Sequence, residues 1–136
     1  TNEAVEVMRE VRRDYANFGL LLDQGHFPVM QECPHKALWM SRDYLTHVHI
    51  GNSYIKDRSA AHFGDKHLPF GVPDSEIGVK ELADFLRTLV ETGFFKRPKP
   101  TRRPVVSFEV GSYQGESEEM VLANVKRVFV EAWELV

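Results

Sequence analysis

Three short strand-like segments alternate along this chain with four segments that carry apolar residues at helical spacing. The short segments cover residues 18–22, 46–50 and 105–110, and the first of them is a continuous apolar run, which is typical of a strand buried on both faces. The helical stripes cover residues 2–15, 34–44, 77–91 and 117–135. Alternation of helix and strand predicts a parallel sheet with right-handed crossovers, which places the chain in the α/β class.

Size, charge and cysteine content exclude several classes of protein. A chain of 136 residues is the size of one domain, so we treat residues 1–136 as a single unit. A net charge of -3 argues against a nucleic-acid partner, and no apolar run reaches the roughly 18–20 residues that cross a bilayer. Cys33 is the only cysteine, which excludes an internal disulfide and favours a cytoplasmic location. We expect Cys33 to be a small buried hydrophobe.

Polar side chains stand where each predicted strand ends. Asp23 follows the first strand with His26 three residues later, His47 and His49 lie in the second, and Glu109 lies in the third. The carboxyl ends of parallel strands meet at one edge of a sheet, so these groups should converge. Carboxylate and imidazole ligands suit Mn²⁺, Mg²⁺, Co²⁺ or Zn²⁺. Taken singly, each residue could instead be structural: a turn aspartate, a core histidine or an ion-pair glutamate.

The segment 51–76 is too long and too polar for an ordinary connection, and loops of this kind are often functional. Within it, Asp65 and His67 are two residues apart, so in an extended loop both could bind a metal or a substrate hydroxyl. Lys56 and Arg58 could contact an anionic or hydroxyl-rich ligand. The alternative for all four is an exposed surface position.

A basic, proline-rich tract covers residues 95–104 and carries five positive charges. These charges could contact a phosphate. A solvated connection between a helix and the last strand is the simpler interpretation.

Three parallel strands leave two sheet edges and part of the sheet surface uncovered, which is unfavourable for an independent domain. We therefore expect the chain to be the C-terminal portion, about three βα units, of a (β/α)8 TIM barrel whose N-terminal strands are absent from this chain. A free-standing flavodoxin-like sheet is the alternative.

Four motifs strengthen the expectation of a barrel. The segments LLLDQGH (20–26), HVHIGNS (47–53), GDKHLPFG (64–71) and SFEV (107–110) resemble the last three βα units of the xylose-isomerase-like barrel superfamily. That group contains sugar isomerases, sugar-phosphate epimerases and ketose 3-epimerases, with endonuclease IV as a DNA-repair relative. The resemblance runs over essentially the whole chain, and no single motif specifies a substrate.

The resemblance implies a role for each residue that it covers. Asp23, His49 and Glu109 would be three ligands of one divalent metal, with Mn²⁺ as the first candidate. The fourth ligand would be a glutamate from the preceding strand, which this chain does not contain. His26 would contact substrate hydroxyls, and His67, Lys56 and Arg58 are further candidates for substrate binding. His47 and Asp65 are candidates for extra metal or substrate contacts. Glu109 would double as the general acid/base.

The expected function is that of a metal-dependent sugar isomerase or epimerase. It would abstract a proton next to a sugar carbonyl and pass through an enediolate. The expected partners are a small sugar or sugar derivative and the missing N-terminal half of the barrel or another chain, and the complete protein should be a homo-oligomer. Three alternatives remain: a lyase that cleaves C-glycosides of 3-keto-sugars, a zinc phosphodiesterase similar to endonuclease IV, and a non-catalytic barrel remnant or partner subunit.

Overall fold

The computed structural model describes all residues from Thr1 to Val136 and contains three strands and five helices. The strands are β1 (Leu20–Asp23), β2 (Leu45–Ile50) and β3 (Val105–Phe108). The helices are α1 (Asn2–Asp14), α2 (His26–Met30), α3 (Pro34–Ser41), α4 (Val79–Glu91) and α5 (Glu118–Trp133). The predicted helices and strands are all present, within a few residues of the predicted bounds. The short helix α2 was not predicted.

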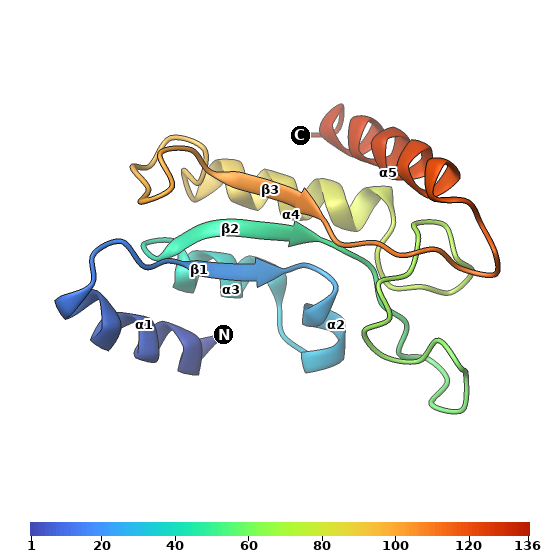
Figure 1. Cartoon of the computed structure of the whole chain (residues 1–136), viewed down its shortest axis with the longest axis horizontal. Coiled ribbons are helices and arrows are strands. Elements are labelled where there is room, and N and C mark those ends of the chain that lie inside the picture. Colours follow the sequence, from blue (N-terminus) through green and yellow to red (C-terminus); the bar gives the residue numbers. More distant parts are fainter.

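The strands form one parallel sheet in the order β1-β2-β3, so β2 is central and the other two strands are edges. Helices α3 and α4 lie behind the sheet in Figure 1, on the same face. This placement follows from the strand order, because successive right-handed crossovers that advance in one direction leave their helices on one face. The chain is therefore a two-layer α/β domain with one bare sheet face.

The expectation of a TIM-barrel portion is wrong. The structure is a small α/β domain built on an open three-stranded sheet, and the sheet does not continue into a barrel wall. The error has a physical origin. The signals in the sequence report parallel strands, crossover helices and polar strand ends, and all of these are shared by open and closed parallel sheets. Closure depends on the number, tilt and stagger of strands, which local patterns do not encode.

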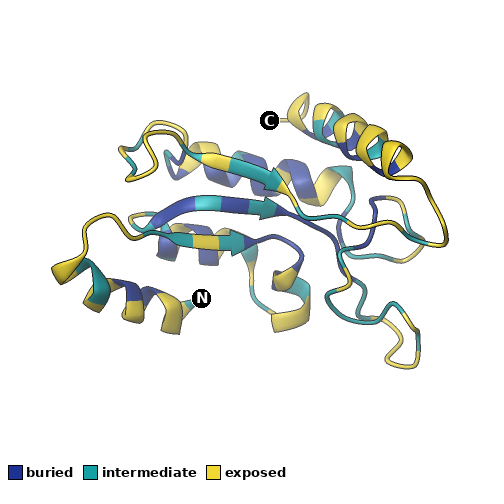
Figure 2. Cartoon of the chain, viewed as in Figure 1, coloured by how far each residue is buried: buried dark blue, intermediate teal, exposed yellow.

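The hydrophobic core lies between the sheet and its helix layer. Figure 2 shows buried residues along β2 and on the sides of α3 and α4 that face it. Helix α4 supplies Leu82, Phe85, Leu86 and Leu89, all at most 2% exposed, at the i, i+3, i+4, i+7 spacing of one helix face. Val48 and Ile50 of β2 pack against them and are fully buried.

The opposite sheet face carries the alternate residues of each strand. Asp23 is paired in register with His49, and His49 with Ser107. Because side chains alternate along a strand, these residues point away from the core, and Glu109 follows Ser107 on the same side. The face is only partly shielded: Leu21 is 44% exposed. No helix of the structure is both long enough and apolar enough to cross a membrane.

Replacement of a buried leucine on α4 tests where the core lies. Leu86→Ala should lower the free energy of unfolding by about 2–5 kcal/mol, because it removes buried methyl groups and leaves a cavity. Leu122→Ala is the matched control, since Leu122 on α5 is 52% exposed, and it should change stability by about 0.5 kcal/mol or less. Urea unfolding followed by circular dichroism measures both. Equal losses for the two variants would contradict this description of the core.

Candidate metal centre

Three side chains from the carboxyl ends of the three strands converge on one point. One ligand atom each from Asp23, His49 and Glu109 lie within 4.8 Å of one another. Backbone hydrogen bonds extend the sheet pairing to this level: the Gln24 amide donates to the His49 carbonyl, and the Glu109 amide donates to the Ile50 carbonyl, both at 2.9 Å. The convergence is thus a consequence of strand register and the two-residue side-chain period.

Asp23 is the most buried member of the cluster, with its side chain 1% exposed. Its Oδ1 accepts a hydrogen bond of 2.6 Å from the Gly25 amide. Its Oδ2 has no hydrogen-bond partner and lies 3.4 Å from His49 Nδ1. A buried carboxylate oxygen without a partner is costly, since burial removes its hydration without replacing it.

Two glycines allow the backbone to approach this carboxylate. A Cβ atom on Gly51 would lie 3.1 Å from the Glu109 carbonyl oxygen and 3.2 Å from Asp23 Oδ1. A Cβ on Gly25 would also lie 3.2 Å from Asp23 Oδ1. These contacts are tighter than ordinary van der Waals separation, so the close approach of the three strand ends depends on glycine at both positions.

Glu109 stands at the solvent side of the cluster. Its side chain is 38% exposed, and it forms a hydrogen bond with His49 Nδ1 through Oε2. We expected Glu109 inside the third strand in an apolar setting, but β3 ends one residue earlier and the carboxylate is half-buried. It can therefore contact a ligand from solvent and the buried Asp23 together.

The pKa values of the two carboxyl groups are shifted in opposite directions. Burial raises the pKa of Asp23 to about 6, and the neighbouring Glu109 carboxyl group acts in the same direction. The pKa of Glu109 is lowered to about 2, chiefly by Asp23 and then by the hydrogen bond from His49. Below about pH 6 the proton therefore resides on Asp23 and not on Glu109.

The arrangement fits a divalent cation. Ligand atoms bound at about 2.1–2.2 Å to one ion lie at most about 4.4 Å apart, so the cluster needs to contract by only a few tenths of an ångström. A cation would give Asp23 Oδ2 its missing partner and would replace the proton held between His49 and Glu109. Two carboxylates and one imidazole form a mostly hard ligand set, which suits Mn²⁺, Mg²⁺, Co²⁺ or Zn²⁺.

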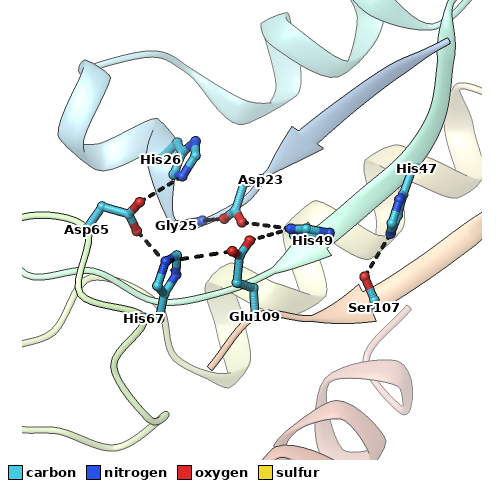
Figure 3. A network of polar contacts seen from close by, with 9 residues as sticks. All are labelled: Asp23, Gly25, His26, His47, His49, Asp65, His67, Ser107 and Glu109. Carbon is cyan, nitrogen blue, oxygen red and sulfur yellow. Dashed lines mark hydrogen bonds and ion pairs between the residues drawn. The ribbon is translucent and has the colours of Figure 1, made fainter. Parts of the chain in front are cut away.

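A second set of polar side chains lies beside the cluster of Asp23, His49 and Glu109, as Figure 3 shows. His26 Nε2 lies 2.8 Å from Asp65 Oδ2, and His67 Nδ1 lies 3.6 Å from Asp65 Oδ1. His67 Nε2 in turn lies 3.7 Å from Glu109 Oε1. The structure therefore places His26, Asp65 and His67 beside the metal cluster, as candidates for substrate or additional metal contacts.

Three other predicted site residues are not members of the cluster. The His47 ring lies edge-on to the His49 ring, with their centroids 4.7 Å apart, but its Nε2 contacts Ser107 Oγ at 2.8 Å and not a carboxylate of the cluster. Lys56 Nζ is 3.6 Å from Asp74 Oδ1 in the long loop, and Arg58 is exposed with no ion pair. Neither Lys56 nor Arg58 contacts Asp23, His49 or Glu109. Cys33 is exposed, so the expectation that it is buried was wrong.

Asn52 holds the long loop over the site, and our sequence analysis did not single it out. Its side chain is fully buried and donates to the Pro69 carbonyl at 3.1 Å, while its Oδ1 accepts from the Ile77 amide at 2.9 Å. These bonds, from the second residue after β2, tie the strand to the part of the chain that follows Asp65 and His67. The available signal was an amide residue just beyond a buried strand, where an unsatisfied amide would be costly.

Comparison with known proteins adds no assignment. No protein-family model matches the chain, and no curated protein matches it.

The pKa of Asp23 predicts how cation affinity depends on pH. Below about pH 6 Asp23 holds a proton that a cation must displace, so Mn²⁺ affinity should fall up to about tenfold for each unit below pH 6 on account of this group. Above that pH this contribution should vanish. Calorimetric titration of Mn²⁺ between pH 5 and pH 7.5, in buffers of different ionisation enthalpy, measures affinity and proton release. An affinity that is constant over this range would contradict the assignment of Asp23 as a ligand.

Proposed function

We propose that this protein is a divalent-metal-dependent isomerase or epimerase that moves a proton next to the carbonyl of a small sugar. The observation that carries the proposal is the buried, unpartnered Oδ2 of Asp23, which faces His49 and Glu109 at the carboxyl edge of the sheet. The four motifs that resemble sugar isomerases and epimerases supply the reaction class. Mn²⁺ is the cation that we would test first.

The cation would be held by Asp23, His49 and Glu109, and when bound it would polarise the carbonyl and hydroxyl oxygens of the sugar. The two carboxylates would balance the charge of a divalent ion, and the ion would still stabilise the negative oxygen of a sugar enediolate placed beside it. The remaining chemistry belongs to the protein. It requires a base near the acidic C–H bond and donors that orient the sugar hydroxyls.

Glu109 is our candidate for that base, because its side chain is more exposed than those of Asp23 and His49. The low pKa of Glu109 at first argues against this role, since an efficient base has a pKa near the working pH. Its largest cause, however, is the neighbouring Asp23 carboxyl group. An ionised Asp23 would repel negative charge on Glu109, and the basicity of Glu109 would rise. Proton abstraction by Glu109 would then yield the enediolate, and return of the proton by Glu109 to the neighbouring carbon would complete isomerisation. Epimerisation would require a second acid on the opposite face, which the resemblance assigns to the missing fourth ligand.

His67 and His26 are candidates for orienting the substrate. His67 Nε2 lies 3.7 Å from Glu109 Oε1, so a sugar hydroxyl placed between them could bond to both groups. His26 is 52% exposed on its side chain and is held at 2.8 Å by Asp65, which fixes the direction of its ring. We therefore infer that the partner is a small sugar, whose hydroxyls could bond to His26 and His67. A cytoplasmic location suits the free, exposed thiol of Cys33.

A zinc phosphodiesterase is the second candidate, and one observation favours it. Asp65 Oδ1 is buried and has no hydrogen-bond partner, and it lies beside His26 and His67. These three residues could hold an additional cation, and hydrolysis of phosphodiesters often uses several metal ions. Metal analysis distinguishes the two functions: the isomerase requires one ion per chain, and the phosphodiesterase requires at least two.

Glu109→Gln should abolish turnover and leave the fold intact. Glutamine keeps the volume of the side chain but cannot accept a proton near neutral pH, and loss of a general base alone costs about 10²–10⁴ in rate. Weaker cation binding would add to this loss. The assay is conversion of a panel of ketoses and aldoses by the purified chain at saturating Mn²⁺, with a thermal melt of each variant.

Glu116→Gln is the matched control for this variant, since Glu116 is an exposed residue of the segment that follows β3. It should retain full activity. If Glu109→Gln kept near-normal turnover, Glu109 would be neither base nor essential ligand. If the wild-type chain converted no sugar of the panel but hydrolysed a phosphodiester with zinc, the second candidate would replace the first.

A further inference from the structure

A pocket of positively charged side chains lies at the amino ends of the strands, at the other end of the sheet from the candidate metal centre. It is lined by Arg12 of α1, Arg42 from the turn before β2, and Arg97 and Lys99 from the basic connection before β3. In Figure 1 the three segments meet at the left, while the strands point to the right. Three separate parts of the chain thus contribute cations to one cavity.

The two arginines from the first part of the chain are held by the protein. Arg12 Nε donates to the Phe18 carbonyl at 2.6 Å, and its guanidinium lies 5.7 Å from the centroid of the Tyr44 ring. The Arg42 guanidinium lies 5.4 Å from the centroid of Trp39. Contact with an aromatic face limits the rotamers of a guanidinium and leaves N–H groups at its edge free to bind an anion.

The two cations of the basic connection are held in the same manner. Arg97 Nε donates to the Thr92 carbonyl at 2.9 Å, and its guanidinium also pairs with Asp43. Lys99 Nζ lies 4.4 Å from the centroid of the Phe94 ring and forms no hydrogen bond or ion pair. Burial, and next the charge of Arg97, lower the pKa of Lys99 below its ordinary value. Lys96, Arg102 and Arg103 are exposed, as a solvated connection predicts, whereas Arg97 and Lys99 are partly buried.

The charges of the pocket are not balanced. Four cations line it, and Asp43 is the only carboxylate among the lining residues, which leaves three positive charges in excess. Like charges that are close together and partly desolvated repel one another, so the free pocket carries an electrostatic cost that an anion would relieve. Pre-oriented cations also bind an anion with little further loss of side-chain entropy.

We propose that this pocket binds the phosphate group of a small molecule. The cavity measures about 150 Å³, the space of roughly five water molecules at about 30 Å³ each, which suits a tetrahedral oxyanion of five heavy atoms. Arginine forks match the oxygens of a phosphate, and three excess positive charges suit a dianion better than a carboxylate.

The site is separate from the proposed catalytic centre. The six residues of β2 span about 20 Å between the two ends of the sheet, so a phosphate bound here does not reach Asp23, His49 or Glu109. The proposal therefore stands independently of the proposed function. A groove for nucleic acid is not favoured, because the cations surround one small cavity and the whole chain carries a net charge of -3.

Titration of the metal-free chain with orthophosphate and with glycerol 3-phosphate, in the presence of a chelator, tests the proposal. The readout is the arginine Nε–H signals in a nitrogen-15 NMR spectrum. We expect saturable binding at one site with Kd below about 1 mM, and weaker binding at high salt. Saturation by both compounds identifies the ligand as an organic phosphate group, and saturation by orthophosphate alone identifies it as the free ion. Either result supports the site.

Two variants and one control locate the binding. Lys99→Gln, which removes no hydrogen bond, and the double variant Arg42→Gln/Lys99→Gln should weaken binding stepwise, by at least about tenfold for the double variant. Lys126→Gln makes the same charge change at an exposed position of α5 with no ion pair, and it should leave Kd unchanged. Absence of saturation would overturn the proposal. Equal weakening by Lys126→Gln, or tighter binding of a short DNA duplex than of either phosphate, would do so as well.

Discussion

The burial of the Asp23 carboxylate is the constraint on which the candidate site depends. One oxygen accepts the Gly25 amide, and the other has no protein donor although its side chain is 1% exposed. A buried carboxylate can be accommodated in two ways: it can keep a proton, or it can bind a cation. Below about pH 6 the metal-free protein uses the first, as the raised pKa of Asp23 indicates. The position of His49 and Glu109 around the free oxygen makes the second available.

The same constraint accounts for the surrounding backbone. Glycine at positions 25 and 51 brings two strand ends to within van der Waals distance of the carboxylate. Asn52 follows directly and ties the long loop to β2, so Asp65 and His67 arrive beside Glu109 from a distant part of the chain. The polar cluster is therefore positioned by main-chain pairing and by one buried amide, and not by the acidic and basic side chains themselves.

Sequence patterns predicted the positions of the helices and strands more accurately than they predicted the architecture of the sheet. The apolar stripe on residues 77–91 and the strand pattern of residues 46–50 predicted α4 and β2, because both patterns are local. Asp23, His49 and Glu109 were predicted to converge because parallel strands place their carboxyl ends together, and the structure brings them together. The barrel was wrong, since closure is a property of the whole sheet. Lys56 and Arg58 were predicted from their charge and from the resemblance, and nothing in the sequence indicates that Lys56 pairs with Asp74.

The central claim is that Asp23, His49 and Glu109 hold one divalent cation. An anomalous difference map from a crystal of the chain grown with Mn²⁺ tests it directly. The account predicts a peak at about 2.1–2.3 Å from Asp23 Oδ2, His49 Nδ1 and a Glu109 carboxylate oxygen. A map without a peak at this position, or with one only beside His26, Asp65 and His67, would contradict it.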